Sequence, residues 1–444
     1  MDSTHNLTVA QIEKQKQLLL RADSGLSLNT CLNSEVCQGI IGRYQGFRER
    51  IYTPVRTLFT FIKQVLGPDK SCRKAVAGVA TEEFVSNGGD ISTNTGPYCK
   101  ARQRLSETMV RELVTTVGQS STRGAPRSWK AYGRQLKAFD GTTVKATDTA
   151  KNQSAFPQHK NQAKGAGFPI LRIVTVMSLT IGTVIGYATG AYKGKGTGEA
   201  SLLREIADCI EKDDIVLGDA YFPSFFTIAD LSRRGADGIF RGQGQRHYDF
   251  RKGIRLGKND HVVIWKKPKQ KPEWMTKDEY DSYPNEISVR EFKVSGAVYV
   301  TTFLDSKKYF RKELAEIYVK RWQIEINLKS VKSVMEMDML SCKTPDMLRK
   351  EIGIHFLAYN FIRLLMAEAC IKHDKFPWEV SFKGTMQLLN TVTPFFLIGS
   401  KDKNKILYEK MLEWIVINRV GNRPGRVEPR LVKQRRKAFS LLKR

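Results

Sequence analysis

Apolar and polar positions change their spacing along the chain, and this divides the chain into regions of different secondary structure. In roughly the first 125 residues, and again from residue 308 onward, apolar residues recur every three or four positions, as in amphipathic helices. Between these regions, short apolar runs are bounded by Gly, Asn and Pro residues, which is typical of strands. The pattern predicts an α/β protein with helical regions at both ends.

The central region is predicted to contain three strands, a helix and a fourth strand, in that order. Strands are expected at 135–139, 170–179, 183–192 and 215–217, and helices at 199–211 and 224–234. Asp140 follows the first strand and Asp219 follows the fourth. This order is that of a ribonuclease-H-like core, and ligands of such sheets bind at the carboxyl ends of strands. One such Asp is usually a turn former or a helix cap, but two in this topology favour a functional site.

The segment 308–335 is predicted to form one helix with unusual chemistry. It contains no Gly or Pro and is rich in Lys, Glu, Leu and Ile. At about 100° per residue, one face of this helix carries Tyr318, Arg321, Glu325, Lys329 and Lys332. A lone carboxylate among cations suits a site that holds a phosphate beside a metal ion. The alternative is that Glu325 simply pairs with its neighbours, as on many exposed helices.

An excess of positive charge indicates a polyanionic partner, in particular nucleic acid. Lys and Arg total 73 against 45 Asp and Glu, a formal net charge of +28. In YCKARQRL, Lys100 and Arg104 share a helix face and Arg102 lies beside them. The helices predicted at 71–85 and 97–116 resemble a DNA-docking unit, with an ordinary solvated surface as the alternative. The tail at 423–444 has nine basic residues and one acidic residue, and we expect it to contact the nucleic-acid backbone.

The remaining composition argues against several other classes of protein. The seven Cys residues form no CxxC pair and the six His residues do not cluster, which disfavours zinc sites, His-activated nucleophiles and disulfide-rich secreted folds. The longest apolar stretch, 170–188, is interrupted by polar residues and is predicted as two buried strands instead of a membrane span. We therefore expect a cytoplasmic protein with reduced thiols and no membrane partner.

Alternating runs such as HVVIW and VREFKV, separated by turn segments rich in Pro, Lys and Asn, predict an antiparallel β insertion within the core. Further helices are expected at 8–22, 58–65, 348–371 and 408–416. The predicted organisation has five parts: a helical DNA-binding region at 1–125, the first part of the catalytic core at 126–234, the β insertion at 235–306, the second part of the core with the Glu helix at 307–372, and a helical, basic C-terminal region at 373–444.

Three carboxylates from separate elements can hold two divalent metal ions. Asp140, Asp219 and Glu325 offer the hard oxygen ligands that Mg²⁺ prefers, and Mn²⁺ can replace it. Two such ions support an in-line phosphoryl transfer that needs no covalent protein intermediate. Tyr318 is an alternative nucleophile, but the sequence provides no cluster of Arg and His around it.

These motifs resemble those of a known family. The insertion sequence 4 family of bacterial DDE transposases carries a Y-(2)-R-(3)-E-(6)-K signature, and this chain reproduces it with Tyr318, Arg321, Glu325 and Lys332. Trp322, directly after the Arg, is also typical of that family. The segments FDGTTV, LGDAYF and YCKARQRL and the basic tail resemble it as well, so the likeness spans residues 30 to 440 approximately.

The resemblance implies a DNA transposase that binds terminal inverted repeats, cuts the transposon ends and joins the 3′-OH to target DNA. It would use two Mg²⁺ ions held by Asp140, Asp219 and Glu325, and would act in the bacterial cytoplasm, at the nucleoid, as a homodimer in a synaptic complex. Taken with the basic segments, the residues expected to contact DNA are Tyr318, Arg321, Trp322, Lys329, Lys332, Tyr299, Tyr98, Lys100, Arg102 and Arg104.

Two questions stay open at this point. Family members that form a DNA hairpin stack a flipped base on a Trp before the Glu helix, whereas GAVYVTTF offers Tyr299 there, so the hairpin step is undecided. A structure-specific nuclease of the same fold and an inactive DNA-binding descendant are the alternative functions. The β insertion and basic flanks disfavour the first, and the presence of all three carboxylates disfavours the second.

Overall fold

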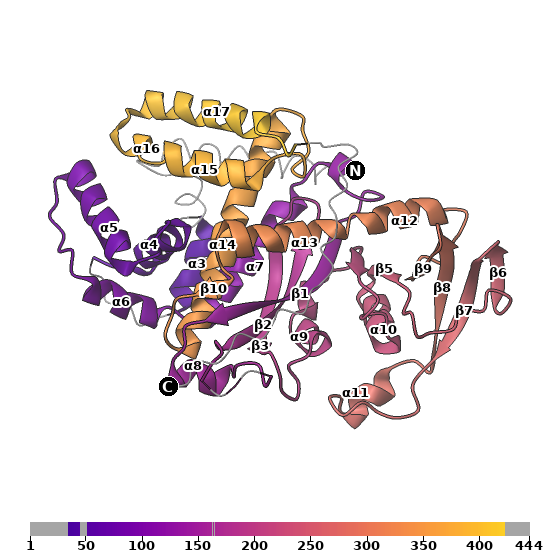
Figure 1. Ribbon diagram of the computed structural model, residues 1–444. Coiled ribbons are helices and arrows are strands. Elements are labelled where there is room, and N and C mark those ends of the chain that lie inside the picture. Colours follow the sequence, from indigo (N-terminus) through magenta and orange to yellow (C-terminus); the bar gives the residue numbers. More distant parts are fainter. Residues whose placement is uncertain (1–33, 45–50, 162, 164, 422–444) are drawn as a thin grey trace.

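The computed structural model describes residues 34–44, 51–161, 163 and 165–421. The helix expected at 8–22 and the basic tail at 423–444 therefore lie outside the described residues. Within them, the chain forms a mixed α/β structure in which helices pack around one large sheet (Figure 1). At this level, the predicted fold class is confirmed.

A ten-stranded sheet runs through the described chain in the order β3-β2-β1-β4-β5-β9-β8-β7-β6, with β10 paired to β1. The strands are β1 Leu136–Ala146, β2 Ile170–Ser178, β3 Val184–Ala191, β4 Ile215–Gly218, β5 Asp237–Arg241, β6 Ile254–Gly257, β7 Asp260–Lys266, β8 Glu286–Val294, β9 Ala297–Thr301 and β10 Met339–Leu340. β2 pairs antiparallel with β1 and β3, whereas β1, β4 and β5 run parallel. The carboxyl ends of β1 and β4 therefore point to the same edge of the sheet.

The strands of the predicted insertion extend the same sheet. β5 lies inside the range predicted for the insertion, yet it pairs parallel with β4 as a core strand does. β9 then pairs antiparallel with β5, and β8, β7 and β6 follow as an antiparallel meander. Figure 1 shows these strands at one end of the molecule, away from the N-terminal helices.

The described chain also forms a series of α-helices. They are α3 Glu35–Arg43, α4 Pro54–Leu66, α5 Cys72–Asn87, α6 Thr95–Arg104, α7 Glu107–Arg123, α8 Ala150–Ala155, α9 Glu199–Glu205, α10 Phe225–Arg234, α11 Lys277–Ser282, α12 Arg311–Val319, α13 Trp322–Lys329, α14 Pro345–Lys372, α15 Phe382–Val392, α16 Phe395–Ile398 and α17 Lys401–Ile417. A π-helical turn, Ser330–Val334, follows α13.

Two cores lie on the two faces of the sheet. Because side chains alternate along a strand, β1 sends Ala138 to one face and Phe139 to the other. Ala138 belongs to a large core that includes α7, α13 and α14, whereas Phe139 belongs to a second core with α9 and α10. The sheet is thus covered by helices on both faces, as a buried parallel centre requires.

The helix predicted at 97–116 is wrong in its length. The segment expected as a single helix at 97–116 forms α6 and α7, which are separated by Leu105 and Ser106. Leu105 leaves helical geometry, and the Ser106 hydroxyl accepts a hydrogen bond from the Met109 N–H, which starts the new helix. The Ser was the local signal for this boundary.

The longest helix, α14, is a core element. It is the one helix of the described chain that is long and apolar enough to cross a membrane. However, 83% of its most apolar window is buried inside the protein, against α4, α7 and α17. Its apolar composition is accounted for by this packing, as the sequence predicted. The apolar stretch at 170–188 forms β2 and the start of β3, also as predicted.

Candidate active site

β1 is longer than predicted, and this changes the setting of Asp140. The strand continues to Ala146 because it pairs with β2 as far as Lys145, whereas its pairing with β4 stops at Ala138. Asp140 therefore lies in the middle of β1, just beyond the point where β4 separates from it. Its carboxylate accepts a hydrogen bond of 2.8 Å from the Gly141 N–H.

Asp219 follows β4 directly, as predicted. Its carboxylate accepts a hydrogen bond of 2.8 Å from the Tyr221 N–H, which fixes the turn after the strand. Gly218 before it has to be small, since a Cβ there would lie 2.8 Å from the rings of Phe139 and Phe240. Asp140 and Asp219 thus flank the gap that opens between β1 and β4.

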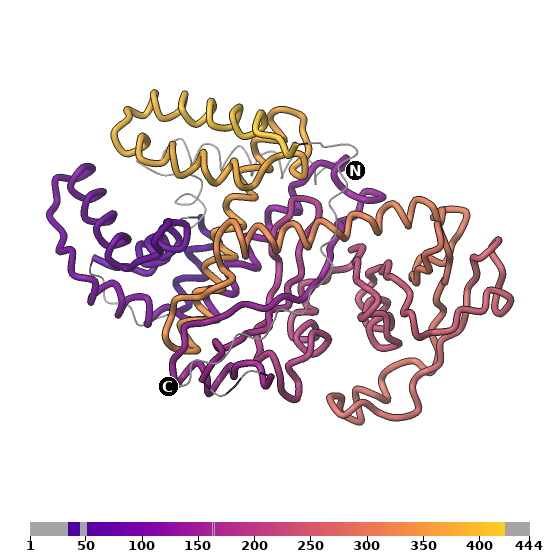
Figure 2. The backbone as a smooth tube through the Cα atoms, viewed as in Figure 1, coloured from indigo at the N-terminus to yellow at the C-terminus, as the bar shows by residue number. Residues whose placement is uncertain are grey.

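The helix with Glu325 is not the single α-helix that the sequence predicted. Between α12 and α13, the N–H groups of Arg321, Gln323 and Ile324 bond to carbonyls three residues earlier, which tightens the chain locally. After α13, the π-helical turn widens it again around Lys332. Figure 2 shows that the path stays nearly continuous through α12 and α13, and α13 packs on β1.

Arg321 connects two of the three carboxylates. Its guanidinium donates a hydrogen bond of 2.6 Å to Glu325 Oε1, and its other terminal nitrogen lies 4.0 Å from Asp140 Oδ2. Only 15% of the Arg321 side chain is exposed. The pairing of Glu325 with Arg321 that we considered as an alternative does occur, but here it forms inside a carboxylate site and not on a solvated face.

Asp140 lies in the electrostatic fields of both other carboxylates. Burial raises the pKa of Asp140 to about 6; its own hydrogen bond and Arg321 oppose this rise, and the charges of Asp219 and Glu325 add to it. Burial also raises the pKa of Tyr318, which lies in the fields of Arg321 and Asp219. A divalent cation would relieve the repulsion at Asp140. The oxygen donors fit such an ion, although the described residues contain no group of three or more His, Cys, Asp or Glu already arranged to hold one.

A fourth carboxylate near this edge was missed from the sequence. Glu199, in the first turn of α9, packs so closely on Gly141 that a Cβ at that position would lie 2.4 Å from its carboxyl group. The sequence predicted the start of a helix after YKGKGTG, but it gave no sign that Glu199 would pack on Gly141 of β1. Glu199 approaches β1 from the face opposite α13.

Comparison with known proteins gives this site a family. A family model described as the transposase DDE domain matches residues 131–361, which includes all three carboxylates and the sheet that carries them. This chain belongs to the DDE transposase family.

Individual relatives agree with this assignment. The chain is 26% identical to transposase InsG for insertion sequence element IS4 of Escherichia coli (strain K12), over 76% of either chain. It is also 31% identical to the transposase for insertion sequence element IS421 of Escherichia coli over 72 residues, 16% of this chain and 19% of that one. The resemblance to the insertion sequence 4 family is thereby confirmed.

A solved structure with a weaker likeness is the piggyBac transposase synaptic complex with hairpin DNA, determined by cryo-EM. The two chains share 8% sequence identity with a TM-score of 0.43, over 94% of this chain and 88% of that one.

The residues predicted to contact DNA on the Glu helix differ in accessibility. Trp322 is 55% exposed, and Lys329 is exposed as well. Lys332 and Tyr318 are half-buried, and the ring of Tyr318 meets Tyr299 edge-on. In this transposase, Trp322 is therefore a surface aromatic and not the core residue considered possible from the sequence.

Tyr299 corrects one expectation. It is only 7% exposed, its ring stacks on Phe292 at 5.2 Å, and the Arg241 guanidinium lies over it at 5.5 Å. Both Phe292 and Tyr299 belong to the core beneath α12, since β8 and β9 pair at this position. Tyr299 therefore has no ring face free for a flipped base in this conformation.

Two N-terminal residues are also corrected. Tyr98 is fully buried against Tyr52 and donates a hydrogen bond to Gln64, and Arg102 is buried against the same glutamine and Cys72. Both hold α6 on α4, so neither can contact DNA as placed. Lys100 and Arg104, on the other face of α6, are exposed and keep the predicted role as an expectation.

Proposed function

We propose that this DDE transposase binds the terminal inverted repeats of a bacterial insertion sequence, cleaves its ends and joins the 3′-OH to target DNA in a cut-and-paste reaction. The observation that supports this most is that Asp140, on β1, lies in the fields of Asp219, just after β4, and of Glu325, on α13. Arg321 contacts Asp140 and Glu325. The strand order β3-β2-β1-β4-β5 supports a ribonuclease-H-like core that runs from residue 126 through β5 and resumes at 307–372.

The proposed metal ligands are Asp140, Asp219 and Glu325, which would hold two Mg²⁺ ions or Mn²⁺ in their place. When bound, these ions activate the attacking oxygen and stabilise the leaving oxygen of phosphoryl transfer. The protein's own residues then orient the DNA: the exposed Lys329 and the half-buried Lys332 neutralise phosphates, and Trp322 offers a ring face to a base or sugar.

The partners of the reaction are the end DNA, the target DNA and a second copy of the chain in the synaptic complex. The region 1–125 would dock on the inverted repeat through the exposed face of α6, and the basic region 373–444 would add backbone contacts. The segment after β5, up to residue 306, would position DNA beside the site, without a stacking role for Tyr299. The enzyme would act in the cytoplasm at the nucleoid.

The test uses labelled end DNA made from the inverted repeats that flank this gene, with a supercoiled plasmid as target. Purified wild type, Glu325→Gln and Glu316→Gln would be incubated with Mg²⁺ or with EDTA. Glu316 is an exposed carboxylate on the preceding helix and serves as the matched control. We expect metal-dependent cutting and joining for wild type and Glu316→Gln, and binding without cutting for Glu325→Gln.

Each other outcome decides between the alternatives. Cutting without joining favours a structure-specific nuclease, and binding without either by the wild type favours an inactive DNA-binding descendant. Cutting by Glu325→Gln in Mg²⁺ overturns the assignment of the three carboxylates.

A further inference from the structure

The position of Arg321 inside the carboxylate site has a consequence beyond DNA contact. A guanidinium stays charged at every pH at which a protein folds, so it is a permanent cation in this site. It already bonds to Glu325 Oε1 at 2.6 Å and lies 4.0 Å from Asp140 Oδ2. These are two of the three carboxylates that the proposed function assigns to metal binding.

Local backbone geometry holds the guanidinium there. The tight turn between α12 and α13 places Arg321 at the start of α13, with Glu325 one helical turn later on the same face. Burial of all but 15% of the side chain gives the ion pair a lower local dielectric than an exposed pair has. A divalent ion approaching Glu325 therefore meets an occupied oxygen and a nearby positive charge.

We propose that Arg321 is the resident cation of the metal-free site, and that it has to leave Glu325 before a divalent ion can be held there. A DNA phosphate is the group that draws it away, because phosphate accepts the same forked hydrogen bonds that a carboxylate does. Metal binding and DNA binding then favour each other, and the coupling is reciprocal by thermodynamic necessity. This inference rests on the proposed function.

The device would restrict metal loading to the DNA complex. Without DNA, Arg321 supplies part of the charge balance that Asp140 and Glu325 need. With DNA bound, the same guanidinium balances a phosphate, and the carboxylates are released for the divalent ion. The free transposase would thus hold little metal and cut little DNA at random.

The experiment measures Mn²⁺ binding directly, by the electron paramagnetic resonance signal of free Mn²⁺, on the full chain. Wild type, Arg321→Gln and Arg321→Lys are titrated without DNA and with a pre-cleaved duplex of the element's end. Lys312→Gln, titrated without DNA, removes one positive charge from the preceding helix at an exposed residue outside the proposed DNA and metal contacts. It controls for general electrostatics.

We expect Arg321→Gln to bind Mn²⁺ at least tenfold more tightly than wild type without DNA, and Lys312→Gln to change the affinity less than threefold. DNA should tighten Mn²⁺ binding at least tenfold in wild type and less than threefold in Arg321→Gln. Arg321→Lys, which keeps the charge, should stay as weak as wild type without DNA. Equal or weaker Mn²⁺ binding by folded Arg321→Gln without DNA overturns the proposal.

A second measurement needs only the wild type and Glu325→Gln, in case Arg321→Gln does not fold. Fluorescence anisotropy of the same duplex at constant ionic strength should show that Mn²⁺ tightens DNA binding by the wild type but not by Glu325→Gln. Equal responses of the two proteins overturn the coupling. If the wild type cleaves end DNA but its Mn²⁺ affinity is the same with and without DNA, this inference fails and the proposed function stands. If the wild type neither cleaves end DNA nor binds Mn²⁺ in the presence of DNA, the proposed function itself is refuted.

Discussion

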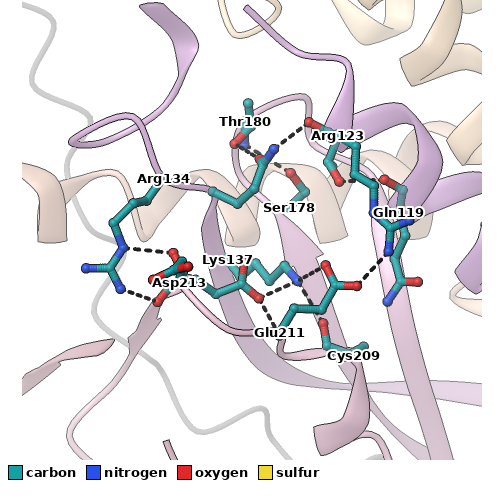
Figure 3. Close-up of polar contacts among 12 residues, drawn as sticks. Gln119, Arg123, Arg134, Lys137, Ser178, Thr180, Cys209, Glu211 and Asp213 are labelled. Atoms are coloured by element: carbon teal, nitrogen blue, oxygen red, sulfur yellow. Dashed lines mark hydrogen bonds and ion pairs between the residues drawn. The ribbon is translucent and has the colours of Figure 1, made fainter. Parts of the chain in front are cut away.

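The segment 137–140 of β1 has a buried lysine at one end and a half-buried aspartate at the other, and the two charges are balanced in opposite ways. Near the start of β1, Lys137 is almost fully buried, and its ammonium bonds to Asp214 at 2.6 Å and to the Cys209 carbonyl at 2.8 Å, with Glu211 3.8 Å away. Figure 3 shows this ammonium between Glu211 and Cys209, and Arg134 beside Asp213. Three residues further along β1, Asp140 faces two other carboxylates and one guanidinium.

The balance of charge distinguishes the structural cluster around Lys137 from the functional cluster around Asp140. Burial raises the pKa of Asp214, but the adjacent Lys137 opposes the rise, so the pair is satisfied within the fold. At the other end, acidic groups outnumber the cation, and the pKa of Asp140 stays near 6. A surplus of buried negative charge costs stability, so it is expected where a ligand of opposite charge binds.

The largest expected effect is at the paired end. Lys137→Met leaves the Asp214 carboxylate buried without its cation, and we expect it to lower the free energy of unfolding by about 3–5 kcal/mol. Urea unfolding followed by circular dichroism measures this. Lys145→Met, at an exposed position on the same strand, is the control and should change stability by less than about 0.5 kcal/mol. If Lys137→Met lowers the free energy of unfolding by less than about 1 kcal/mol, the ion pair between Lys137 and Asp214 does not stabilise the fold as proposed.

At the Asp140 end, removing the charge should raise the free energy of unfolding instead of lowering it. The folded state raises the pKa of Asp140 from 3.8 to about 6, so its ionised form opposes folding above that pH. Asp140→Asn removes the charge and should stabilise the metal-free protein by up to about 3 kcal/mol at pH 8. The gain should shrink as the pH falls from 6 and should vanish below about 4, where the wild-type carboxyl is protonated in both states.

Urea unfolding at pH 4, 6 and 8 without metal tests this prediction. Asp338→Asn, at an exposed position, is the control and should show no such pH profile. If Asp140→Asn is less stable than the wild type at pH 8, the Asp140 carboxylate stabilises the fold, as Asp214 does.

Metal should act on one end only. At ten times its dissociation constant, a bound ion adds about 1.4 kcal/mol to stability, and more at higher concentration. With the pre-cleaved end duplex present, we expect Mg²⁺ to raise the melting temperature of the wild type and of Lys145→Met, but not of a variant with Asp140→Asn and Asp219→Asn together. Differential scanning fluorimetry with matched Na⁺ or Mg²⁺ ionic strength measures the shift, and an equal shift in the double variant would contradict the proposed ligands.

The smallest effect is expected at the rim of the paired cluster. Glu211 is 41% exposed and lies 3.8 Å from the Lys137 ammonium, so solvent screens its contribution. Glu211→Gln should cost no more than about 1 kcal/mol in the same urea assay. A loss as large as that of Lys137→Met would show that Glu211, and not Asp214, is the principal partner.

Most elements followed from local pattern, while their ends depended on neighbours. The strands at β2 and β3 and the helices α10 and α14 lie within a few residues of their predicted positions. β1 ran past its predicted end because β2 continued to pair with it. The helix at 308–335 changed winding twice, just before and just after α13, the segment that packs on β1. The spacing of apolar residues indicates which secondary structure a segment prefers, whereas strand pairing and packing decide where each helix or strand begins and ends.

The sequence by itself determined the chemistry of the site: three carboxylates, their order along the chain, and an Arg and a Glu one helical turn apart with a Lys further on. Only the tertiary structure decided which side chains are accessible and which charges share a field. It buried Tyr98, Arg102 and Tyr299, and it brought Glu199 against Gly141. The physical reason is that the spacing of residues fixes the face of a helix or strand on which a side chain lies, but not what packs against that face.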